Sequence, residues 1–372
     1  MAKFVPHFEV LRGLAALWVF ASHVLVITDL HIPVISRGAL AVDVFIALSG
    51  FVITLMIVNE AENYPRYIFR RFVRLYPLFI IAVILGMATL HLYATVIGSS
   101  PWAAEVRPAF FTRDGNGANF FWTHLLLHLA MLHGVVPDDV LPQAPLMFSG
   151  PLWSISLEWQ FYVVAPFLVP LFYVTSARKA LLAVGVFLGL VVLSFVSRHL
   201  WHAEVPSFLP LKLPLFCVGI VCAVVWPRVK EMDPRQLLAL VAVAAVISMT
   251  LTSSRIAVLI WFATYYCAAV GGKTMITRAV ESLVRLPAAR FLGRISYGLY
   301  VLHMPVLLMI AASIVIPIAG SQSKIAAALL LAAIALPFVI ALSAAAFYGI
   351  EKPLIAWARH FGKGYRSRKL PA

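Results

Sequence analysis

Ten apolar runs, each close to the length of a membrane-spanning helix, constrain this chain of 372 residues more than any other feature of its sequence. About 20 helical residues cross a bilayer core, and lipid leaves the backbone few alternatives to helix. With 62% apolar and 12% charged residues, an ordinary soluble domain is excluded. We therefore predict an all-α polytopic membrane protein with about ten transmembrane helices, near 11–30, 38–58, 76–97, 152–174, 180–199, 209–226, 236–252, 255–271, 293–317 and 325–349.

A further apolar run, 120–134, is too short to cross a bilayer and carries three histidines. We expect a helix that lies in the membrane interface or re-enters it. His124 and His128 have the i, i+4 spacing of metal ligands, but no acidic or cysteine residue accompanies them at a suitable spacing. The sequence therefore predicts no metal site.

The formal charge of +14 arises from 29 Lys and Arg against 15 Asp and Glu. Nucleic-acid binding would need these cations on one exposed face. Instead, most of them fall in the termini and in every second segment that connects two predicted spans. By the positive-inside rule these segments, and both termini, are cytoplasmic. We expect residues 1–350 to form one membrane domain and 351–372 a basic cytoplasmic tail, with no cleaved signal peptide and no nucleic-acid partner.

Four titratable side chains inside the predicted spans stand out: His23, Asp43, Glu158 and His303. Such groups cost several kcal/mol in a membrane unless they pair or face a cavity, so each is a candidate functional residue. His23 lies eleven residues after Arg12, on the same helix face and about 16 Å further along the axis. An imidazole suits general base catalysis near neutral pH, although His23 and His303 equally suit helix packing.

The carboxylates of this set and a pair of guanidiniums suit further roles in a functional site. Asp43 suits the orientation of an imidazole, the binding of an acceptor hydroxyl or the capping of a helix. Glu158 follows Ser154 by four residues, an unusual polar concentration within a span. Arg71 and Arg74 are neighbours on one helix face and suit a phosphate-bearing ligand, although the positive-inside rule alone also accounts for them.

Five motifs occur along the chain in a recognisable order, and together they resemble the acyltransferase 3 family of integral-membrane proteins that acylate bacterial surface and secreted carbohydrates. The resemblance spans nearly the whole chain, and Ile155 stands where the family usually has Leu. The motifs are Arg-x10-His at Arg12 and His23; the segment from Asp43 to Phe51; Arg-x-x-Arg before Pro at Arg71, Arg74 and Pro77; Trp153 to Tyr162; and Ser296 to Pro305.

The resemblance implies transfer of an acyl group, acetyl in the first instance, from acyl-CoA to a hydroxyl of an extracytoplasmic polysaccharide, lipopolysaccharide or glycolipid. It implies a core-only member in the bacterial inner membrane, without a permanently bound cofactor. We expect His23 to act as the base or to carry the acyl group, with Asp43 or Glu158 orienting it. We also expect Arg12, Arg71 and Arg74 to bind acyl-CoA, and the residues expected to line the substrate path are Ser49, Trp153, Ser154, Tyr297 and His303.

A proton-coupled transporter or flippase of glycan intermediates is the competing hypothesis, because buried titratable groups also line transport pathways. Transporters often contain two related halves. The motifs of this chain show no such symmetry, which favours the transferase.

Overall fold

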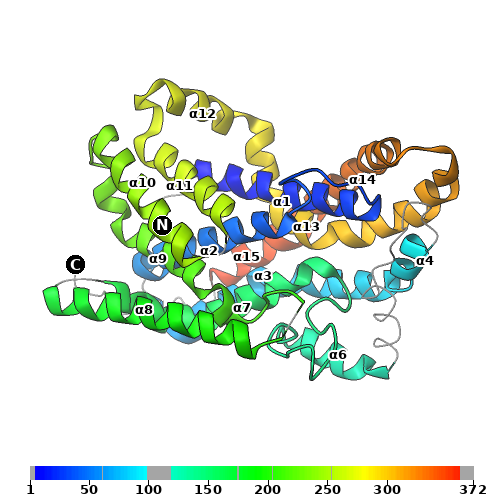
Figure 1. Ribbon diagram of the computed structural model, residues 1–372, viewed down its shortest axis with the longest axis horizontal. Helices are drawn as coiled ribbons and strands as arrows, with labels where there is room; N and C mark the ends of the chain where they lie inside the picture. Colours follow the sequence, from blue (N-terminus) through cyan, green and yellow to red (C-terminus); the bar gives the residue numbers. More distant parts are fainter. Residues whose placement is uncertain are drawn as a thin grey trace.

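The computed structural model describes residues 5–60, 62–98, 119–173, 176–202, 204–252 and 254–360, and all regular structure in these ranges is helical (Figure 1). Ten helices in them are long and apolar enough to cross a membrane, which confirms the predicted all-α class and span count. Their α-helical parts are α1 (Pro6–Ile27), α2 (Gly38–Glu60), α3 (Tyr64–Thr89), α7 (Trp153–Leu168), α8 (Ala177–Leu200), α9 (Leu209–Val229), α10 (Pro234–Leu251), α11 (Arg255–Val270), α13 (Pro287–Ile310) and α14 (Lys324–Ala346).

Short helical segments complete the described chain. Leu92–Gly98 (α4), Met275–Arg285 (α12) and Lys352–Ala358 (α15) are short α-helices, and 3-10 or π turns extend several spans: η1 (Gly150–Leu152), η2 (Val169–Phe172), η3 (Gly271–Lys273), η4 (Ala311–Val315), η5 (Ile316–Ser321) and η6 (Phe347–Glu351). The run 120–134 forms the nine-residue helix α6 (Phe121–Leu129), too short to span. Arg107, Arg113 and the basic tail at 363–369 lie outside the described residues.

The third span begins at Tyr64, well before the predicted start at position 76. Asn63 caps this helix by accepting the backbone N–H of Arg66 at 3.2 Å, and Pro65 occupies a position in the first turn where its missing N–H is harmless. Charge misled the sequence-based boundary, because the arginines of these first turns are paired with carboxylates, as Arg70 is with Glu60 and Glu62. Arg71 and Arg74 therefore lie on one continuous helix.

Glycines allow the closest helix contacts. In Figure 1, α1 and α13 run side by side, and a Cβ at Gly13 would lie only 2.7 Å from the backbone nitrogen of Gly293. Because neither residue carries a side chain, the two backbones touch here. This contact sets α1, which carries Arg12 and His23, directly against α13, which carries His303.

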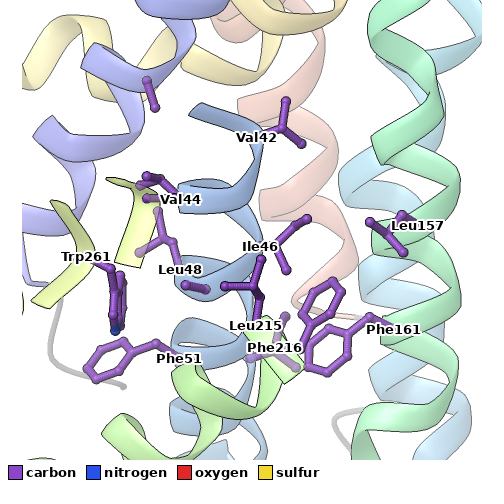
Figure 2. Packing of buried hydrophobic residues seen from close by; sticks show 14 of the residues in the cluster. Val42, Val44, Ile46, Leu48, Phe51, Leu157, Phe161, Leu215, Phe216 and Trp261 are labelled. Atoms are coloured by element: carbon purple, nitrogen blue, oxygen red, sulfur yellow. The ribbon is translucent and has the colours of Figure 1, made fainter. Parts of the chain in front are cut away.

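The apolar core surrounds α2 (Figure 2). Phe51 packs edge-on against Trp261 of α11 with ring centroids 5.7 Å apart, and Phe216 of α9 stacks on Phe161 of α7 at 4.0 Å. Side chains of α2 are buried toward several neighbours, because a central helix of a bundle is apolar on every side. The polar residues of α2 therefore stand out against this packing.

Candidate active site

A cavity of about 780 Å³ opens between α1, α2, α3, α7, α13 and the C-terminal helical segment. Its wall is mostly apolar, but it carries six basic side chains and only two acidic ones, Glu9 and Glu158. Three of the basic side chains, Arg294, Lys352 and Arg359, are exposed and mark the mouth, whereas Arg12, Arg71 and Arg74 are half-buried. The cavity thus combines a cationic entrance with an apolar interior.

Arg12 is fixed by neutral oxygen atoms of α13. Its Nε donates to Ser296 Oγ at 2.7 Å and its Nη2 to the carbonyl oxygen of Gly293 at 2.8 Å. The guanidinium therefore keeps its full positive charge uncompensated by these partners, and it lines the cavity wall.

The two arginines of the Arg-x-x-Arg motif differ in their partners: one is neutralised by an ion pair, and the other has donors left for a ligand. Arg74 forms an ion pair with Glu351, which is 3% exposed, and lies over the Tyr297 ring at 5.2 Å. Arg71 lies over the Tyr162 ring at 5.8 Å, and its buried Nε has no hydrogen-bond partner among the described residues. Arg71 is consequently the member of the pair with donors left for a ligand.

Hydroxyl groups gather around Glu158 in the cavity wall. Tyr162 and Ser49 both donate to Glu158 Oε1, the latter at 3.4 Å. One turn away, Ser154 Oγ and the Tyr300 hydroxyl are 2.7 Å apart, and Tyr300 donates to the carbonyl of Pro151 at 2.9 Å. This polar wall faces the cavity from α2, α7 and α13.

His23 lies beyond the end of the cavity and does not line it. A row of rings leads from the cavity wall toward it: Phe45 to Tyr300 (5.5 Å between centroids), Tyr300 to His303 (6.3 Å) and His303 to His23 (5.0 Å). The hydrogen-bond partner of His23 on another helix is His303, at 3.0 Å between Nδ1 and Nε2. In the described part of the chain, neither Asp43 nor Glu158 bonds to His23.

Asp43 is committed to an ion pair instead. Its Oδ1 accepts from Lys212 Nζ at 2.6 Å and its Oδ2 from the hydroxyl of Ser254. Asp43 and Lys212 are 3% and 8% exposed. The pair ties α2 to α9 and to the residue preceding α11.

The matching sequence profile is that of an acyltransferase domain (Acyl_transf_3), and it covers residues 5–348. The chain belongs to this acyltransferase 3 family. With ten candidate spans it is a multi-pass membrane member of this family, which favours the transferase hypothesis over the transporter. No solved structure matches it.

Several curated proteins that are similar to this chain are named as acetyltransferases or acyltransferases. It is similar to the peptidoglycan O-acetyltransferase OatA of Listeria monocytogenes, with 25% identity over 82% of this chain and 50% of that protein. It is also similar to a putative acetyltransferase, ORF330, of Acidianus two-tailed virus (25%; 80% and 82%). A third is acyltransferase MdmB of Streptomyces mycarofaciens (26%; 59% and 57%). The chain thus spans half the length of OatA.

Of the remaining predicted site residues, some line the cavity and others are buried behind its wall. Ser49, Ser154 and Tyr297 line the cavity, whereas Trp153 is buried in the apolar core and His303 is fully buried beside His23. Glu351, Lys352, Arg359 and Lys212 were missed by the sequence-based reasoning. An acidic residue at the end of the last apolar run is the local signal for Glu351; Lys212 has none beyond its place in a span.

Three histidines of α6 and the following turn form a separate cluster outside the spans. The rings of His128 and His133 stack at 4.0 Å, and both are fully buried, as is His124. Burial lowers the pKa of His124 and of His133 to about 4 and lowers that of His128 as well. Among the residues described, no group of three or more His, Cys, Asp or Glu is placed to hold a metal ion.

Proposed function

We propose that this acyltransferase moves an acyl group, acetyl in the first instance, from acyl-CoA to a hydroxyl of an extracytoplasmic carbohydrate. The observation that carries the proposal is the 780 Å³ cavity with a cationic mouth and an apolar interior. Its volume lies in the usual range for small-molecule sites. Acyl-CoA has the matching chemistry, with anionic phosphates at one end and a thioester on a long, weakly polar arm.

The basic mouth gives the proposed orientation. Basic residues prefer the cytoplasmic side, where acyl-CoA is made, so we place Arg294, Lys352 and Arg359 at the cytoplasmic surface. Arg71 then contributes a free guanidinium to the phosphates, which it matches geometrically. Arg12 adds charge deeper in the wall, and Arg74 with its partner Glu351 holds the wall in place.

The proposed chemistry places the thioester near the hydroxyl-rich wall at Glu158 and Tyr300 and uses His23 as the base. The acceptor hydroxyl gives its proton to His23 as its oxygen bonds to the thioester carbonyl carbon, the C–S bond breaks, and the CoA thiolate takes the proton from His23. The thioester reaches His23 only if the acyl end advances past the Tyr300 ring, because His23 lies beyond it. An acyl-histidine intermediate uses the same ring nitrogen.

A carbohydrate acceptor is proposed from the relatives. OatA is named as a peptidoglycan O-acetyltransferase, and a sugar hydroxyl is the functional group that such an enzyme modifies. Mass analysis of cell-surface glycans from cells with and without this protein tests the acceptor class: loss of an acyl group from one glycan supports it, and identical glycan profiles contradict it.

Donor binding is tested with purified protein and acetyl-CoA by titration calorimetry. We expect Arg71→Ala to weaken binding about 10-fold or more, since a hydrogen bond to a charged group contributes about 1.5–3 kcal/mol. Arg278→Ala is the matched control, because Arg278 is an exposed cation on α12 that does not line the cavity. Equal affinities of wild type and Arg71→Ala would contradict the assignment of Arg71, and an absence of acetyl-CoA binding would contradict the proposed donor.

A further inference from the structure

His23 and His303 lie on different helices and meet through their ring nitrogens. Nε2 of His303 is 3.0 Å from Nδ1 of His23. Nδ1 of each ring also faces the carbonyl oxygen four residues earlier, at 3.0 Å from Val19 for His23 and 3.1 Å from Leu299 for His303. These contacts determine where the ring protons lie.

A carbonyl oxygen only accepts hydrogen bonds, so the Nδ1 atom that faces it carries the proton. His303, protonated on Nδ1, has a lone pair on Nε2 that accepts the Nδ1–H of His23, which is shared with Val19. The opposite tautomers would set two unprotonated nitrogens against two carbonyl oxygens. The partners thus assign Nδ1–H to both rings and leave Nε2 of His23 unprotonated.

Exposure separates the roles of the two rings. His303 is 0% exposed and therefore does not contact a substrate, whereas His23 retains part of its surface. The two carboxylates that were predicted to orient His23 are engaged elsewhere: Asp43 with Lys212 and Glu158 with Tyr162. His303, on the neighbouring helix α13, is the side chain that contacts Nδ1 of His23.

We infer that His303 is the positioning residue for His23: it accepts the Nδ1 proton, fixes the ring and its tautomer, and stabilises the imidazolium formed when Nε2 takes the acceptor's proton. This inference rests on the proposed function. His303 occupies the place that a carboxylate holds in Ser-His-Asp hydrolases. A neutral ring suits this depth, because a carboxylate without a partner is unfavourable within a membrane.

Two amide substitutions separate positioning from simple packing. In His303→Gln the side-chain amide oxygen is separated from Cα by the same number of bonds as Nε2 of the original histidine. It can therefore still accept the hydrogen bond from Nδ1–H of His23. In His303→Asn the amide ends at the position of Nδ1, so the bond to Leu299 is retained and the contact with His23 is lost. Both variants keep a polar side chain at the same buried site, which makes them matched.

We expect kcat for acyl transfer to fall about 10²-fold in His303→Asn, the lower end of the usual contribution of general base catalysis. His303→Gln is expected to recover most of this loss, and the affinity for acetyl-CoA is expected to stay unchanged in both. His199→Asn is the control, because His199 makes the same bond to the carbonyl four residues earlier on the exposed helix α8. Equal kcat values for the Gln and Asn variants, whether retained or lost, would overturn the inference.

A second measurement does not depend on transfer activity. In ¹⁵N-histidine NMR of the protein in bilayers, with signals assigned through His23→Asn and His303→Asn, we expect protonated Nδ1 and unprotonated Nε2 in both rings, and a ¹⁵N–¹⁵N coupling across the bond between them. A protonated Nε2 on His23 at neutral pH would overturn the inference. If the wild-type protein transferred no acyl group but showed this coupling, the proposed function would fail while the hydrogen bond stood.

Discussion

Lys212→Met is expected to destabilise the helix bundle by about 3–5 kcal/mol, because it leaves the carboxylate of Asp43 buried without a counter-ion. The two groups are 2.6 Å apart, and Asp43 is only 3% exposed, so water cannot replace the lost ammonium. Within the described ranges, Ser254 is then the remaining hydrogen-bond partner of the carboxylate. The free energy of unfolding in mixed micelles measures this loss.

The double variant Asp43→Asn/Lys212→Met is expected to recover most of that stability. Asn removes the charge and keeps an oxygen for Ser254, so no uncompensated ion remains. Lys324→Met is the control: its partner Asp29 is exposed, and an exposed pair contributes at most about 1 kcal/mol. Wild-type stability of Lys212→Met would refute this reasoning. So would Asp43→Asn with wild-type stability and a 100-fold loss of transfer, which would assign Asp43 to the chemistry.

Two further perturbations test the fold. Stability should fall as pH drops from about 6.5 toward 4, by up to about 3 kcal/mol each for His124 and His133, because the unfolded chain binds protons that the buried rings exclude; thermal unfolding across this range checks it, and a flat profile contradicts it. Gly13→Ala should cost about 1–3 kcal/mol through the clash with Gly293, whereas Gly185→Ala on α8, with nothing within 4 Å of the added carbon, should leave the unfolding midpoint unchanged or higher.

The helices were predictable because a membrane leaves the backbone so few options. Ten apolar runs gave ten spans, and the shared face of Arg12 and His23 followed from helical periodicity alone. The predicted start of the third span, at position 76, was wrong because the first turns of α3 carry arginines and so fall outside the apolar run, although the helix already begins at Tyr64.

The partners of the charged and titratable residues were not predictable, because they are brought together by packing between helices far apart in sequence. Asp43 and Lys212 are separated by 169 positions, Arg74 and Glu351 by 277, and His23 and His303 by 280. No local pattern links such pairs. For this reason we predicted Asp43 or Glu158 as the partner of His23 from the sequence, whereas in the structure the partner is His303.

Acyl transfer by purified protein in proteoliposomes tests the central claim most directly. With labelled acetyl-CoA on the side of the basic mouth and a glycan acceptor on the other, we predict label in the glycan for the wild type and a loss of at least 100-fold for His23→Ala, with acetyl-CoA binding retained. Transfer by His23→Ala at the wild-type rate would contradict the account.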